Sequence, residues 1–131
     1  MVFRRLSVVA VAVIVSACGG IIDPSKNTID PISGTLQVGG QVQSTHTLGK
    51  NGEVEVTMTS VTPTPANGSI GLQLGQVVNG TCSLLQGYSA AGVVNRKVQF
   101  GVLNKGTYCL VVFDPGVLTV PVTYAGNFSH P

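Results

Sequence analysis

The side chains with the strongest intrinsic chemistry in this 131-residue chain are three cysteines and two histidines. Nucleophilic catalysis needs a Ser, Thr or Cys beside a positioned base, and the only histidines are His46 and His130. The chain contains neither a Gly-x-Ser-x-Gly elbow nor an HExxH motif. Glu53 and Glu55 share one face of a predicted strand, where we expect solubilising side chains rather than paired catalytic acids. These patterns predict a protein that is not an enzyme.

One pair of possible metal ligands depends on a predicted hairpin. If the turn at Gly49–Gly52 closes that hairpin, His46 faces Glu55 on the same side of the sheet. Zinc sites recruit three or four ligands, and His130 could supply a third only if the terminus folds back. We therefore expect a surface His–Glu pair, with no bound metal and no cofactor.

Tyr88 is the one candidate for contact with a partner. It lies in Gln86–Gly92, a stretch with the composition of a loop tip. The other aromatic residues fall in predicted strands, where core packing is the default role. Aromatic residues make up 5% of the chain and Trp is absent, so no platform for stacking sugar rings is evident. The alternative is that the Tyr88 side chain only fills the interior of its own loop and contacts no partner.

Two further polar features are interpreted as structural. Arg96-Lys97 is expected to be a solvated strand edge. The carboxylate of Asp114 is expected to cap the Asp-Pro-Gly turn that it begins.

Composition excludes several classes of protein. Charged residues make up 9% of the chain, so it lacks the cluster of cations that nucleic-acid binding requires. A hydrophobic fraction of 44%, with many Val, Thr and Gly residues, is not typical of disorder or of a coiled coil. A length of 131 residues supports one domain.

Residues 1–17 have the pattern of an export signal. Arg4 and Arg5 precede an apolar run from Leu6 to Val15, which is too short to span a bilayer. Val15-Ser16-Ala17-Cys18 then resembles the lipobox of bacterial lipoproteins. That resemblance implies cleavage before Cys18, a diacylglyceryl group on its thiol and acylation of its new amine, so lipid would hold the protein to a membrane. The alternative is a secretory signal that leaves a free thiol.

The residues after Cys18 predict the localisation of the protein within the envelope. In bacterial lipoproteins, an Asp directly after the lipidated Cys resembles a signal for retention in the inner membrane. This chain has Gly19 and Gly20 there instead. The absence of this Asp favours the outer membrane if the host is a diderm bacterium. Loss of residues 1–17 leaves five basic and five acidic residues, and five minus five gives a formal charge of zero. The predicted mature chain therefore has no charge preference for acidic partners.

Residues 18–33 are predicted to be the lipidated N-terminus and a flexible tether. Ile-Asp-Pro occurs twice in this stretch. Pro24 and Pro31 oppose regular strand pairing, and Asp-Pro favours turns or extended backbone.

Residues 34–131 are predicted to form a single all-β domain. Apolar Val54, Val56 and Met58 alternate with polar neighbours, as in a strand with one wet face. Turn residues such as Asn79-Gly80 separate about eight such runs, which indicates an antiparallel β-sandwich or jelly roll. The predicted strands are Gly34–Val38, Val42–Leu48, Glu53–Ser60, Ile70–Val77, Thr81–Leu85, Val93–Val102, Thr107–Phe113 and Thr119–Phe128.

Cys82 and Cys109 are predicted to form a disulfide. With Cys18 assigned to lipid, they are the two cysteines left in an exported domain, where oxidation is permitted. Both lie on predicted strands, which can bring their Cα atoms to the required separation of about 5.5 Å. The alternative is two reduced cysteines that pack as small hydrophobic residues.

The domain also resembles a known family. The segments Gly106–Asp114, Pro121–Tyr124 and Ser129–Pro131 look like uncharacterised bacterial lipoproteins whose single domain is similar to the pre-peptidase C-terminal (PPC) β-sandwich. Gly49–Met58 also fits that family's glycine turn followed by an alternating strand. The resemblance implies a β-sandwich that accompanies secreted enzymes or sits alone on the envelope, and some members bind polymers or calcium. Clustered carboxylates for calcium are missing here.

These observations predict an envelope lipoprotein with a non-catalytic β-sandwich that binds a protein or polysaccharide partner. One alternative is a purely structural lipoprotein without a specific ligand. Another is an enzyme of unfamiliar mechanism. Fold alone does not choose among them, because one fold hosts many functions.

Overall fold

The computed structural model describes residues 26–131, and its regular structure consists of β-strands. None of the elements in these residues is a helix long and apolar enough to cross a membrane. The eight strands are β1 (Thr28–Leu36), β2 (Gln41–Leu48), β3 (Gly52–Thr62), β4 (Ser69–Val78), β5 (Thr81–Val93), β6 (Lys97–Leu103), β7 (Gly106–Phe113) and β8 (Val122–His130).

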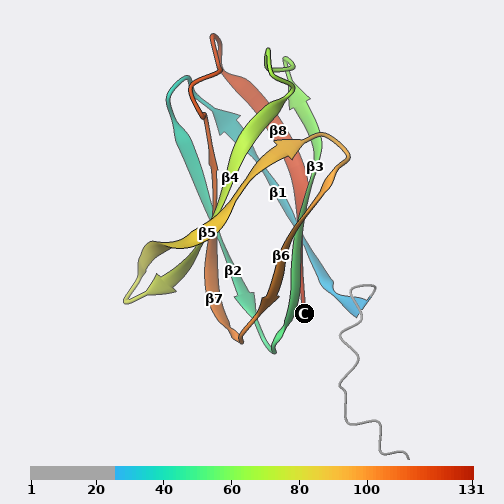
Figure 1. The fold of residues 1–131 in the computed structure, drawn as a ribbon, viewed down its shortest axis with the longest axis vertical. Helices are drawn as coiled ribbons and strands as arrows, with labels where there is room; N and C mark the ends of the chain where they lie inside the picture. Colours follow the sequence, from blue (N-terminus) through green and yellow to red (C-terminus); the bar gives the residue numbers. More distant parts are fainter. Residues whose placement is uncertain (1–25) are drawn as a thin grey trace, which may run out of the picture.

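The strands form two four-stranded antiparallel sheets that pack face to face (Figure 1). One sheet has the order β1-β8-β3-β6 and the other the order β2-β7-β4-β5. Successive strands from β1 to β4 alternate between the sheets, which is the double Greek-key arrangement of a jelly roll. The predicted all-β sandwich of eight strands is therefore confirmed.

The core lies between the two inner faces. Alternating positions on β3 face inward, so Val54, Val56 and Met58 are at most 1% exposed, as the period-two pattern predicted. The side chains across the core from them come from β4 and β7: Ile70, Leu72, Leu74, Leu110 and Val112. Phe128 of β8, the neighbouring strand of the same sheet, packs beside them. Burial of these side chains is the main source of stability.

The first strand begins earlier than the sequence indicated. β1 starts at Thr28 and pairs with β8 along its whole length, so residues 28–33 belong to the domain and not to a tether. Ile32 is 5% exposed and part of the core. Pro31 is tolerated because β1 is an edge strand, where a missing N–H need not leave a neighbouring strand unpaired.

The predicted pairing of β2 with β3 is wrong. These strands belong to different sheets, so Gly49–Gly52 is a connection between sheets rather than a hairpin turn. β2 pairs with β7 instead, with His46 opposite Tyr108. The Asn51 side chain accepts a hydrogen bond from the backbone N–H of Lys105 at 2.7 Å, which ties this connection to the β6–β7 turn.

Candidate functional site

Two bulges at the free edges of the sheets aim aromatic rings into one groove. On β5, the pairings Gln73–Ser89 and Gly75–Leu84 leave residues 85–88 opposite the single residue Leu74. On β6, Phe100 is the extra residue of a second bulge, between the pairs that Val54 and Glu55 make. β-Bulges bend a strand and redirect its side chains, and they are common beside functional sites.

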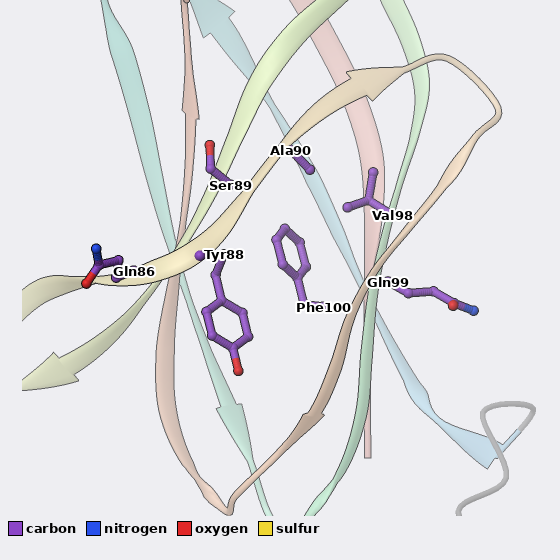
Figure 2. Close-up of a pocket in the computed structure, with 8 residues that line it drawn as sticks. Gln86, Tyr88, Ser89, Ala90, Val98, Gln99 and Phe100 are labelled. Carbon is purple, nitrogen blue, oxygen red and sulfur yellow. The ribbon is translucent and has the colours of Figure 1, made fainter.

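The groove lies between β5 and β6 and has a volume of about 370 Å³. Figure 2 shows the rings of Tyr88 and Phe100 in the space between the two strands. Tyr88 is half-buried and Phe100 is 8% exposed. Ala90 and Val98 also line the groove, whereas the side chains of Gln86 and Gln99 extend away from it. A groove of this size falls within the range of ligand-binding sites.

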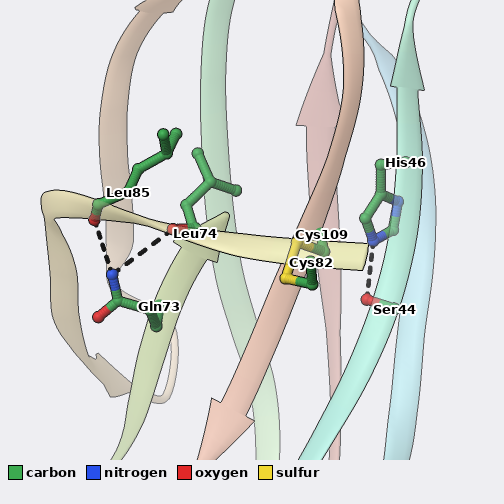
Figure 3. Close-up of a disulfide and its surroundings, with 7 residues drawn as sticks. All are labelled: Ser44, His46, Gln73, Leu74, Cys82, Leu85 and Cys109. Atoms are coloured by element: carbon green, nitrogen blue, oxygen red, sulfur yellow. Dashed lines mark hydrogen bonds between the residues drawn. A yellow bond between two sulfur atoms is a disulfide. The ribbon is translucent and has the colours of Figure 1, made fainter. Parts of the chain in front are cut away.

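Side-chain hydrogen bonds hold the β5 bulge. The Gln73 amide donates to the backbone oxygen of Leu85 at 2.9 Å, and its contact with the oxygen of Leu74 is 3.5 Å (Figure 3). Gly87 within the bulge has φ of +84°, a conformation that other residues rarely adopt. The prediction that Tyr88 lies at a loop tip is therefore wrong. Tyr88 lies within β5, at a position that the bulge directs toward the core.

Tyr88 also approaches a second tyrosine in the core. Burial raises the pKa of the Tyr108 phenol, and the nearby Tyr88 phenol adds to this increase. The hydrogen bond that Tyr108 donates to the backbone oxygen of Asn104, at 2.8 Å, acts in the opposite direction. The Tyr88 side chain packs against the core cluster and also lines the groove.

At the opposite side of the sandwich, a polar cluster joins β1, β2 and β8. Asp30 Oδ2 lies 2.9 Å from His46 Nδ1 and 2.8 Å from His130 Nε2. The other nitrogen of His46 lies 2.8 Å from Ser44 Oγ (Figure 3). The His46 ring stacks on Phe128, with centroids 3.9 Å apart and an interplanar angle of 8°. Both histidines are buried, at 6% exposure each.

The hydrogen bonds of Ser44, His46 and Asp30 follow the order found in serine hydrolases. The Asp30 carboxylate is shared with His130, however, and one face of the His46 ring is covered by Phe128. We interpret the cluster as a structural link between the sheets. Within residues 26–131, no set of three or more His, Cys, Asp or Glu side chains is placed to hold a metal ion.

The expected pair of His46 and Glu55 does not exist, because β2 and β3 lie in different sheets. Glu55 is 7% exposed, so it is not a solubilising side chain. Its carboxylate accepts a hydrogen bond from Gln99 at 3.1 Å and lies 3.7 Å from Lys97 Nζ. The Lys97 side chain is 68% exposed, in line with the predicted solvated strand edge.

Cys82 and Cys109 form the predicted disulfide, with Cα atoms 6.0 Å apart. Figure 3 shows the bond between the two cysteines. Both sulfurs pack against Gly75 of β4. A Cβ atom at Gly75 would come within 2.7 Å of one sulfur and 2.8 Å of the other. The chain therefore needs glycine at this position for the disulfide to pack on β4.

Asp114 caps its turn as predicted. Its Oδ1 accepts hydrogen bonds from the backbone N–H groups of Gly116, Val117 and Leu118 at 2.8–3.1 Å. Its Oδ2 accepts one from Gly39 at 2.8 Å, a link to the β1–β2 turn that the sequence did not indicate. The Gly39 hydrogen bond is the main cause of the lowered pKa of this carboxyl.

The sequence interpretation missed Phe100, Asp30 and Ser44. The expected core position of Phe100 is confirmed, but no residue pattern indicated that it also lines the groove. Pro31 argued against the strand that places Asp30 beside His46. A weak signal for the groove was present, because Gly87 and Gly101 each adjoin an aromatic residue and both have positive φ. Cys18 lies outside the residues that the structure describes.

Comparison with known proteins supports the fold. No protein-family model matches the chain, and no curated protein matches it. Among solved structures, the chain is similar to the Yersinia pseudotuberculosis-derived mitogen, with a TM-score of 0.56 and 16% sequence identity. The match covers 80% of this chain and 87% of the mitogen chain. At this level of identity the similarity concerns the fold alone.

Proposed function

We propose that this protein is a lipid-anchored component of a bacterial cell envelope whose β-sandwich binds a protein or polymer partner in the β5–β6 groove. The observation that carries the binding role is the convergence of two bulges, which direct Tyr88 and Phe100 into one groove. β-Bulges redirect side chains and are over-represented next to active sites, which supports a binding role for the groove between them.

The anchor rests on the N-terminal sequence. The basic residues Arg4 and Arg5, the short apolar run and Val15-Ser16-Ala17-Cys18 together form a lipoprotein signal. A disulfide in the domain fits an exported protein, since such bonds persist in oxidising compartments. Gly19 and Gly20 favour the outer membrane of a diderm host. The resemblance of Gly106–Asp114 and Pro121–Tyr124 to PPC domains supports an envelope role.

Lipidation can be tested at Cys18. The wild-type protein, expressed in a bacterium, should incorporate an alkyne analogue of palmitate and sediment with membranes. Cys18→Ser should do neither, because the acceptor thiol is gone. Ser25→Ala, which leaves the lipobox unchanged, is the matched control and should behave as wild type. Equal labelling of wild type and Cys18→Ser would exclude a lipid anchor at this residue.

The binding role can be tested at Tyr88. We expect crosslinking in cells to capture a partner with wild type and to lose most of it with Tyr88→Ala, since aromatic anchors dominate binding energy. Leu84→Ala is the matched control, because Leu84 is on the same strand and 58% exposed but does not line the groove. Thermal melts would verify that both variants fold. If wild type and Tyr88→Ala capture the same partner in equal yield, the groove is not the binding site.

A further inference from the structure

The lysines of the domain are distributed unevenly along its long axis. Lys50 lies in the β2–β3 connection and Lys105 in the β6–β7 turn. Both connections lie at the end of the sandwich where β1 begins and β8 ends (Figure 1). Lys26 precedes β1 at this same end, and all three side chains are exposed. Three of the four lysines in residues 26–131 thus form one group, which we call the basic end.

Hydrogen bonds hold the backbone segments of the basic end together. The Asn51 side chain accepts a hydrogen bond from the backbone N–H of Lys105 at 2.7 Å, which joins the two connections that carry lysines. Before β1, the Asn27 amide donates to the backbone oxygen of Glu53 at 3.0 Å and to Ser129 Oγ at 3.1 Å. The start of the domain is therefore tied to β3 and β8, and the three lysines project from one bonded framework.

Acidic side chains do not neutralise this group within the domain. None of the three lysines forms an ion pair with an acidic residue of the described range 26–131, whereas Lys97 lies 3.7 Å from Glu55. Glu53 is near the basic end but half-buried, and the Asp30 carboxylate is held by two histidines. A terminal carboxylate on Pro131 would still leave more cations than free anions there. The formal charge of zero predicted for the mature chain therefore hides a positive end.

The proposed lipid anchor would bring this same end to the membrane. Seven residues, 19–25, separate Cys18 from Lys26, and Asp23 is the one charged residue among them. A chain of that length reaches at most about 29 Å when fully extended. β3 has 11 residues and so measures about 36 Å, which places the opposite end of the sandwich much farther from the lipid. The basic end is therefore the part of the domain nearest to the bilayer.

We propose that the basic end is a membrane-contact surface, on which Lys26, Lys50 and Lys105 bind the headgroups of anionic phospholipids. This inference rests on the proposed anchor at Cys18 and adds an orientation to it. Each lysine close to an anionic surface raises the binding constant about fivefold. The short tether keeps the three lysines beside the headgroups, so contacts that are weak singly act together. The sandwich then stands on the bilayer with its opposite loops directed outward.

The test measures how fast a water-soluble acetylating reagent modifies each lysine of the purified, lipidated protein in vesicles. One set of vesicles is phosphatidylcholine alone, and in the other about a third of the lipid is phosphatidylglycerol. Anionic lipid should slow the acetylation of Lys50 and Lys105 at least about fivefold, because headgroups cover their amines. Lys97, whose side chain is 68% exposed away from the basic end, is the internal control and should react equally in both. At about 1 M salt the difference should vanish.

A double variant tests whether the lysines act together. Lys50→Gln combined with Lys105→Gln should restore fast acetylation of Lys26 in the anionic vesicles, since one cation alone holds the end weakly. Lys97→Gln is the matched control and should keep Lys26 protected as in wild type. Thermal melts would verify that all variants fold. Equal acetylation rates in the two kinds of vesicle, or protection of Lys26 that persists in the double variant, would overturn the inference.

Failure of the anchor is distinguished by the intact mass of the purified protein, which shows whether acyl chains are attached. A protein without acyl chains would refute the proposed anchor and this inference with it. An acylated protein whose lysines react equally in both kinds of vesicle would refute only the membrane contact. Protection that rises with the ratio of protein to lipid would identify a second copy of this chain as the occupant, and would also overturn the inference.

Discussion

At the scale of single residues, Asp30 is the polar side chain on which the β1–β2 side depends. Burial alone raises the pKa of its carboxyl, but hydrogen bonds from His46 and His130 and the charges of those rings outweigh it. The net result is a pKa below the ordinary value of 3.8. His130 also lies 3.0 Å from the backbone oxygen of Pro131, so the cluster fastens the end of β8 to β1 and β2.

The lowered pKa predicts a pH dependence of stability. Because the folded protein holds the Asp30 carboxyl ionised more strongly than the unfolded chain does, its contribution is present above pH of about 4 and is lost as pH falls through the lowered value. Asp30→Asn should be less stable than wild type at neutral pH, and the difference should shrink in acid. Urea denaturation across this pH range measures both.

Glu53→Gln serves as the control for this experiment, since it removes a carboxylate outside the cluster. A gap between wild type and Asp30→Asn that stays constant from neutral to acid pH would show that the carboxylate charge is not what stabilises the link between the sheets.

At the scale of elements, β4 has glycine where the outer face of its sheet must accept large neighbours. Gly75 lies under the disulfide, and a Cβ there would also come within 2.8 Å of the backbone oxygen of Ser83. Cys82 and Cys109 are separated by 27 positions in the chain. The disulfide joins β5 to β7 across β4, and it fastens the half of β5 that precedes the bulge.

Gly75→Ala should therefore destabilise the domain by about 1–3 kcal/mol through overpacking against the disulfide. Gly49→Ala is the matched control, because a Cβ at Gly49 meets no atom within 4 Å, and it should change stability by less than about 0.5 kcal/mol. Denaturation in urea with the disulfide intact gives both values. Equal stability of the two variants would show that β4 relaxes away from the sulfurs without cost.

At the scale of the whole molecule, the domain extends to the start of β1. Removal of residues before Gly34 would delete six of the nine residues of β1 (28–33 of 28–36), including Asp30 and the buried Ile32. β8 would lose its β1 partner along most of its length and keep only β3, and the polar link to β2 would disappear. The edge of one sheet would be open and its core exposed.

We predict that a chain beginning at Lys26 folds cooperatively and that a chain beginning at Gly34 does not. Far-ultraviolet circular dichroism and thermal melts compare the two directly, and the longer chain is the control. A cooperative melt of the shorter chain near the same temperature would mean that β1 is dispensable and that the predicted tether boundary at residue 33 is adequate.

The fold class, most strand positions and the disulfide could be predicted from the residues alone, because they depend on local patterns and on the number of cysteines. Alternation of apolar and polar residues defines strands through the two-residue period of β structure, and Asn79-Gly80 marks a turn, with positive φ at both residues. The two cysteines on predicted strands of the β domain left one intramolecular pairing. Asp114 was placed correctly for the same reason, since a cap involves residues close in sequence.

The pairing of strands could not be predicted from local patterns, and the candidate site depends on which strands are neighbours. His46 contacts Asp30 and not Glu55, because the chain crosses to the other sheet between β2 and β3. Tyr88 and Phe100 meet because bulges on two edge strands face each other, and a bulge is visible only once pairing is known. The physical reason is that sheet order and register arise from packing between residues distant in sequence, which a local pattern does not encode.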